Sequence, residues 1–121
     1  MALEQLDFRD FVYWERESND TIDYKKIYVD MVGGDVPTGL MLSQLIFWRL
    51  PAKNKDANHT KLTITREGRK WLAKSDGDWY AETRLTAKQA ARCRGILESQ
   101  GLISVEKWKF AGAPTVHISI N

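Results

Sequence analysis

The sequence is poor in the side chains that build metal sites and nucleophilic active sites. Its 121 residues include one cysteine, Cys93, and two histidines, His59 and His117. A single cysteine excludes an intramolecular disulfide and any zinc site that depends on several thiolates. A nucleophilic cysteine also needs a neighbouring base, and no histidine lies near Cys93 in the sequence. We therefore expect a protein that is not an enzyme and that uses no metal or other cofactor.

Long apolar runs are also missing. The longest, Val36 to Leu50, is interrupted by polar residues and by Pro37, and it is too short to span a bilayer. The first 20 residues lack the basic segment and apolar core of a secretory signal. These features predict a cytoplasmic protein without membrane contact.

The composition is that of a soluble globular domain, with 43% hydrophobic and 28% charged residues. The length suits one domain with a short appendage. The net charge of +2 conceals an asymmetry: residues 1–60 hold seven Lys/Arg against ten Asp/Glu, and residues 61–121 hold eleven against six. A basic second half favours a surface that faces a polyanion, and ordinary scatter of surface charge is the alternative.

The first segment, 1–21, is predicted to be an N-terminal extension. A short helix is expected from Leu3 to Trp14, followed by a turn or linker over 15–20. Its apolar residues do not fall on one clean helical face, so they must pack against a second copy or fold back against helix 36–50. The sequence therefore leaves open a homodimer through this segment. The apolar residues concerned are Leu3, Leu6, Phe8, Phe11 and Trp14.

Two helices are predicted in the rest of the first half. The pair Gly33-Gly34 is able to end a helix over 24–32 in the left-handed conformation. Asp35 is then placed to cap a helix over about 36–50. This second helix is apolar on nearly all sides, so we expect it at the centre of the domain.

The second half is predicted to contain two hairpins that flank two helices. Gly68 tolerates the positive φ of a hairpin turn, and Ser75 and Thr86 are favourable N-caps. The expected elements are strands over 61–65 and 69–73, helices over 76–83 and 87–100, and strands over 102–110 and 114–120.

The last two strands differ in their apolar pattern. In the first, apolar residues shift from odd positions (Ile103, Val105) to even ones (Trp108, Phe110), which predicts a bulge near 106–107. In the second, strict alternation predicts one buried and one solvated face, with His117 on the solvated face.

One stretch resembles a known family. Ser75…Arg84-Leu-Thr86-Ala-Lys-Gln-Ala-Ala-Arg92…Ile96-Leu97-Glu-Ser-Gln-Gly101-Leu-Ile103 is similar to the recognition helix and wing signature of prokaryotic winged helix–turn–helix DNA-binding domains. The segments 36–50 and 61–73 also resemble the winged-helix domains of phage and plasmid replication proteins. The resemblance covers roughly 24–121. It implies an α+β fold, a winged helix–turn–helix over 22–121 with an additional β-hairpin and a short N-terminal extension.

The helix over 87–100 has two unlike sides. At about 100° per residue, Ala90, Cys93 and Leu97 fall on one side, while Lys88 and Arg92 fall on the opposite side. Between 86 and 97 there are three cations and no acid. A recognition helix needs positive charge for phosphates and small residues that let it settle in the major groove.

The sequence thus predicts a non-catalytic protein that binds double-stranded DNA, and the resemblance implies a role in phage or plasmid replication. A small transcriptional regulator and a winged-helix protein–protein interaction module are the alternatives. Gln89 is the residue expected to contact a base edge. Arg94 is expected to contact a phosphate or to pair with Glu98. The other site residues are expected to contact phosphates or guanine edges, or to cap a helix. The predicted DNA-binding residues are Lys74, Ser75, Thr86, Lys88, Gln89, Arg92, Arg94, Lys107 and Lys109.

Overall fold

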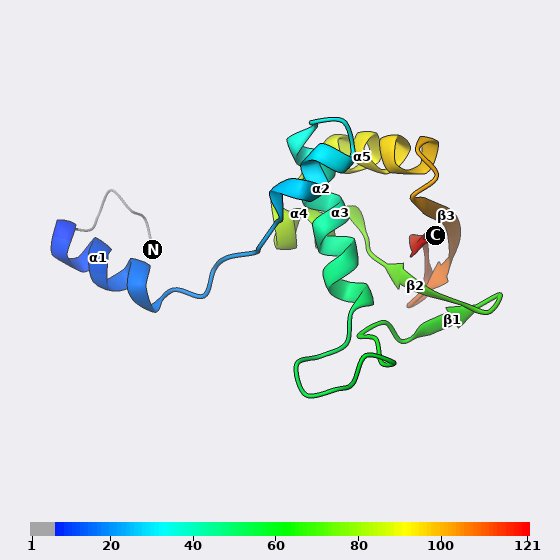
Figure 1. Cartoon of the computed structure of the whole chain (residues 1–121), viewed down its shortest axis with the longest axis horizontal. Coiled ribbons are helices and arrows are strands. Elements are labelled where there is room, and N and C mark those ends of the chain that lie inside the picture. The colour runs from blue at the N-terminus through cyan, green and yellow to red at the C-terminus, as the bar shows by residue number, and fades with distance from the viewer. Residues whose placement is uncertain (1–6) are drawn as a thin grey trace.

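The computed structural model describes residues 7–121, so Leu3 and Leu6 of the expected first helix lie outside the described residues. The described chain is a mixed α+β protein, as predicted (Figure 1). Its elements are α1 (Phe8–Glu17), α2 (Lys26–Met31), α3 (Val36–Arg49), β1 (Ile64–Arg66), β2 (Arg69–Ala73), α4 (Asp76–Thr83), α5 (Ala87–Ser99), β3 (Ile103–Phe110) and β4 (Ala113–Ile120).

Helices α3, α4 and α5 begin at the predicted N-capping residues, and the predicted Gly33-Gly34 pair follows α2, which is shorter than the predicted 24–32. Asp35 accepts a hydrogen bond from the Thr38 backbone N–H at 3.1 Å and starts α3. Gly33 and Gly34 adopt φ of +88° and +93° after α2. Ser75 starts α4 and Thr86 starts α5, each in a reciprocal capping box with the residue three positions later. Local hydrogen bonding therefore explains where these helices lie.

The four strands form one antiparallel sheet in the order β1-β2-β4-β3. Leu72 of β2 lies opposite Ile118 of β4, so the β1–β2 hairpin extends the sheet rather than standing apart from it. Both hairpins turn on two residues with positive φ, which are Glu67-Gly68 and Ala111-Gly112. Such turns match the twist of the flanking strands.

Strand β1 is shorter than expected, because the start of its predicted range is bound elsewhere. The Lys61 ammonium donates to the backbone oxygens of Phe47 (2.9 Å), Leu50 (3.2 Å) and Pro51 (3.0 Å). These contacts fix Lys61 at the C-terminal end of α3, where positive charge is favourable. Pairing with β2 begins only at Ile64.

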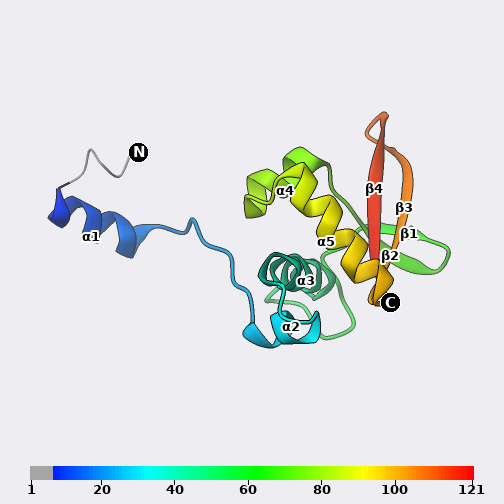
Figure 2. The same cartoon turned by 90° about the horizontal axis from the view of Figure 1, so that it is seen from above.

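Helix α3 is central, with α2 on one side and α4 and α5 on the other (Figure 2). Its middle turns are buried, whereas Phe47 and Leu50 at its end are 48% and 52% exposed. Helix α5 packs against α3, α4 and β3. The core is formed by Val32, Met41, Leu42, Leu45, Trp79, Leu85, Ala90, Cys93, Leu97, Ile103 and Ile118.

The predicted bulge in β3 is wrong. Strand β3 pairs with β4 in unbroken register, from Ile103 opposite Ile120 to Phe110 opposite Ala113. The apolar shift arises because the sheet carries apolar side chains on both faces. Ile103 faces the helices, whereas Trp108 lies on the other face, with its ring 4.9 Å from that of Trp71.

The prediction of a solvated His117 is also wrong, since this side chain is only 2% exposed. The rings of Trp108 and Phe110 lie 5.1 Å and 6.1 Å from its imidazole. Its Nδ1 lies 2.8 Å from the backbone oxygen of Thr115. The alternation along β4 correctly places His117 on the opposite face of the sheet from the core residues. Aromatic side chains cover that face, so His117 is buried there.

Helix α1 runs to Glu17, three residues beyond the predicted end at Trp14, and it stands away from the domain (Figure 1). None of its residues is buried. The alternative of a fold-back against α3 is therefore not what residues 7–121 adopt. Among the helices of 7–121, none has the length and apolar character required to cross a membrane.

Candidate nucleic-acid interface

The two predicted sides of α5 are confirmed. Ala90, Cys93 and Leu97 are fully buried at 0% exposure, whereas Lys88 and Arg92 are exposed. Burial raises the pKa of the Cys93 thiol through desolvation, which keeps the sulfur protonated and unreactive. The outward face thus offers cations and small side chains, and the inward face is packing.

The N-terminus of α5 is closed by its own side chains. Thr86 Oγ1 accepts from the Gln89 backbone N–H at 3.2 Å, and Gln89 Oε1 accepts from the Thr86 backbone N–H at 2.9 Å. Both predicted contact residues are therefore engaged in capping. A base contact by the amide oxygen of Gln89 would have to replace this hydrogen bond. Lys88 lies in the same first turn, which contains no acidic residue.

Arg92 has a partner that the sequence does not reveal. Its Nη1 lies 3.2 Å from Oδ1 of Asp35, the residue that caps α3. The Thr38 hydroxyl and the Arg92 guanidinium both donate to Asp35 and lower the pKa of its carboxyl. Both side chains of the ion pair are partly exposed, so a phosphate at α5 would compete with Asp35 for Arg92.

Arg94 lies at the flank of α5, between the exposed and buried sides. Its Nη1 is buried and has no hydrogen-bond partner within residues 7–121. The predicted pair with Glu98 is not formed in that part of the chain. Arg94 is therefore a weaker candidate for phosphate contact than Lys88.

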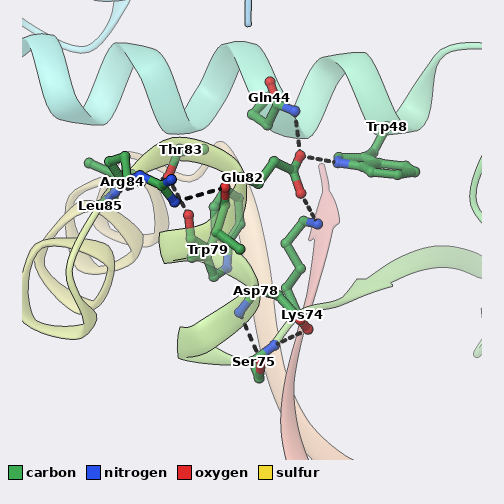
Figure 3. Close-up of polar contacts among 11 residues, drawn as sticks. Gln44, Trp48, Lys74, Ser75, Asp78, Trp79, Glu82, Thr83, Arg84 and Leu85 are labelled. Atoms are coloured by element: carbon green, nitrogen blue, oxygen red, sulfur yellow. Dashed lines mark hydrogen bonds and ion pairs between the residues drawn. The ribbon is translucent and has the colours of Figure 1, made fainter. Parts of the chain in front are cut away.

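Lys74 lies inside the protein rather than on its surface, at 9% exposure (Figure 3). Its ammonium pairs with the carboxylate of Glu82 and lies 4.7 Å from the centre of the Trp48 ring. The same carboxylate accepts hydrogen bonds from the Gln44 amide and the Trp48 indole N–H. Because Lys74 is committed to this buried cluster, we leave it out of the candidate interface.

Ser75 is likewise committed to its helix. Its hydroxyl accepts from the Asp78 backbone N–H, and its own backbone N–H donates to Asp78 Oδ2, both at 3.1 Å (Figure 3). The Ser75 backbone N–H, followed by the Ser75 hydroxyl, lowers the pKa of the Asp78 carboxyl. Asp76 adds a second acidic group to the first turn of α4. Two carboxylates at this helix end disfavour a phosphate there, so the prediction for Ser75 finds no support.

The predicted lysines of β3 are exposed and share one face. Lys107 lies opposite Val116 and Lys109 lies opposite Pro114. Both lysines are on the same face of the sheet as Val105, because alternate residues of a strand share a face. Because Val105 packs against the helical core, both lysines lie on the side of the sheet that carries α5. The β3–β4 hairpin extends alongside α5 and ends in a free tip (Figure 2).

Sequence reasoning missed Arg84, an exposed cation just before α5. It has φ of +63° at the end of α4, and its Nη1 donates to the backbone oxygens of Tyr80 (3.0 Å) and Ala81 (3.2 Å). Its guanidinium also lies 5.1 Å from the centre of the exposed Tyr80 ring. The available signal was a cation between two predicted helices.

The resulting candidate interface comprises Arg84, Lys88, Lys107 and Lys109, with Arg92 shared with Asp35. Within residues 7–121, no group of His, Cys, Asp and Glu side chains is arranged to hold a metal ion. In comparisons with models of protein families, with curated proteins and with solved structures, nothing matches the chain.

Proposed function

We propose that this chain is a non-catalytic protein that binds double-stranded DNA as a winged helix–turn–helix domain. The order α4, α5, β3–β4, with β2 beside β4, supports this architecture, in which β3–β4 would be the wing. One observation carries the proposal: α5 presents an exposed, acid-free first turn with Lys88, on the side of the sheet where Lys107 and Lys109 are exposed.

In the proposed complex, α5 lies in the major groove and the β3–β4 hairpin lies on the flanking backbone. The exposed positions Ala91 and Gly95 are small, which permits a close approach between helix and groove. Lys88 reaches a phosphate or a guanine edge, while Lys107 and Lys109 contact phosphates. Arg84 adds positive charge at the start of α5 and also contacts the backbone.

The process is proposed on the sequence resemblance alone. It favours replication of a phage or plasmid in the cytoplasm, and transcriptional regulation is the nearest alternative. A protein–protein interaction module is the third, and the failure of DNA binding would favour it.

The test is fluorescence anisotropy with a labelled random-sequence duplex at several salt concentrations, with the single strand as a control. If about four phosphates are neutralised, log K falls with log salt concentration at a slope of about −3.6. Lys88→Ala should weaken binding and reduce that slope by about 1, whereas Lys55→Ala, in the exposed loop after α3, should change neither. Binding that is absent at low salt, or independent of salt, would overturn the proposal.

A further inference from the structure

The domain has an open apolar groove at the exposed end of α3. It measures about 330 Å³ and lies between the segment 21–25 and the C-terminal half of α3. Its apolar walls include Ile22, Ile46, Phe47 and Leu50. Exposed apolar surface of this kind usually marks a binding site.

The apolar residues within α1, a set that omits Leu3 and Leu6, form a complementary apolar stripe. At 100° per residue, Phe8, Phe11, Val12 and Trp14 fall within 160° of the helix circumference, and the rings of Phe11 and Trp14 lie 6.2 Å apart. Phe8 is 81% exposed. Tyr13 lies opposite Phe11, outside the stripe. A helix with one broad apolar face is stabilised mainly by packing that face against another surface.

The connection between α1 and the groove directs α1 outward. Helix α1 ends where the Ser18 backbone N–H donates to the Trp14 backbone oxygen (2.9 Å). The Ser18 hydroxyl then accepts from the Asp20 backbone N–H (3.2 Å). Directly afterwards, the segment from Thr21 forms one wall of the groove. Figures 1 and 2 both show α1 leaving the domain along this path. No residue of its own α1 lines the groove, which is therefore accessible to the α1 of another molecule.

Charge also favours this occupant. Glu15 lies within the apolar stripe of α1, so a surface that covers the stripe must offer a cation. Lys25 and Asp23 both line the groove, and the Lys61 ammonium, which donates to backbone oxygens at the end of α3, lies 4.2 Å from the centre of the Phe47 ring. In the exchange, the apolar walls would receive Phe11 and Lys25 would pair with Glu15.

We propose that two copies of the chain form a dimer by exchanging α1, each helix occupying the groove between 21–25 and α3 of the other copy. Such an exchange is two-fold symmetric and closed, so it stops at two copies. It goes beyond the proposed function, because contact between α5 and DNA does not require it.

Sedimentation velocity of the full chain over a range of concentrations tests the exchange. The wild type should form dimers reversibly. Phe11→Asp in the stripe and Phe47→Asp in the groove should each shift the dissociation constant by at least about 100-fold, because a buried unpaired carboxylate costs several kcal/mol. Tyr13→Asp, on the opposite side of α1, should leave the dimer intact. Leu50→Asp is a second groove variant in case Phe47→Asp lowers the melting temperature.

Mixing the two disabled variants is decisive. The Phe47→Asp chain retains an intact α1 and the Phe11→Asp chain retains an intact groove, so their mixture should regain dimers held by one exchanged helix. A Phe47→Asp chain that still forms wild-type dimers would indicate pairing of α1 with α1, and a mixture that stays monomeric would equally overturn the exchange. A wild type that is monomeric throughout would also overturn it. Duplex binding by Phe11→Asp, measured separately, distinguishes failure of the dimer from failure of DNA binding.

Discussion

The carboxylate of Glu82 on α4 accepts the indole N–H of Trp48 on α3 at 2.6 Å (Figure 3). The Gln44 amide and the Lys74 ammonium donate to the same carboxylate, so three donors, two from α3 and one from the β2–α4 connection, converge on one acceptor. This cluster fixes α4 against α3. Because α4 packs on α5, it also fixes the orientation of the candidate interface.

Glu82→Gln should destabilise the fold by about 3 kcal/mol, because the nearly buried Lys74 loses its counter-charge. Trp48→Phe, which removes one donor and preserves an aromatic ring, should cost only about 1 kcal/mol. Glu98→Gln on the exposed side of α5 is the matched control and should change little. Urea denaturation at neutral pH measures all three. Equal stability of Glu82→Gln and wild type would show that the cluster contributes nothing.

A second prediction concerns the close approach of α2 to α3. A Cβ added at Gly39 would lie 2.5 Å from Val29 Cγ2 and 2.7 Å from Val29 Cα. Gly39→Ala should therefore destabilise the protein by about 1–3 kcal/mol, despite the better helix propensity of alanine.

Gly95→Ala supplies the control, because Gly95 is also within a helix but has open space around its Cα. It should stabilise the protein by up to about 1 kcal/mol. Thermal melting of the two variants separates packing from propensity. A Gly39→Ala protein that melts at or above the wild-type temperature would show that α2 does not need this contact.

The sequence predicts an element well when its determinants are local. Helix α4 begins and ends as expected, at Asp76 and Thr83, because its capping box joins Ser75 to a residue only three positions away. The α+β class follows from the same kind of signal, since turns and apolar periodicity are local properties.

The site was predicted less well, because its contacts join residues far apart in the sequence. From the sequence, Lys74 is predicted to be an exposed cation before a helix. In the fold, Trp48 and Glu82 contact its ammonium. Arg92 reads as a free cation, although its partner Asp35 is 57 residues away. His117 is covered by Trp108 from the neighbouring strand. No periodicity within one element contains this information.

The stability of the fold should decrease in acid, and two helix caps contribute to this effect. The pKa of Asp35 is lowered by the Thr38 hydroxyl and Arg92, and that of Asp78 by the Ser75 N–H and hydroxyl. A carboxyl with a lowered folded-state pKa stabilises the fold above its unfolded pKa of about 3.9 and loses this contribution as pH falls through the folded value.

Urea midpoints between pH 7 and pH 2.5 should therefore fall below about pH 4. In the double variant Asp35→Asn/Asp78→Asn the decline should be shallower, because neither asparagine titrates. An identical pH profile for this variant and wild type would show that these caps do not contribute to acid sensitivity.

The Arg92–Asp35 pair predicts that one acidic side chain restrains DNA binding. Asp35→Asn retains an N-cap, since asparagine caps helices as well as aspartate does, but it removes the charge that engages Arg92. We expect this variant to bind duplex about two- to fivefold more tightly at low salt, because Arg92 becomes available to a phosphate. Arg92→Ala should weaken binding more in the Asp35→Asn background than in wild type. Anisotropy titrations of the four proteins give this double-mutant cycle. Equal losses from Arg92→Ala in both backgrounds would mean that Asp35 does not compete with DNA for Arg92.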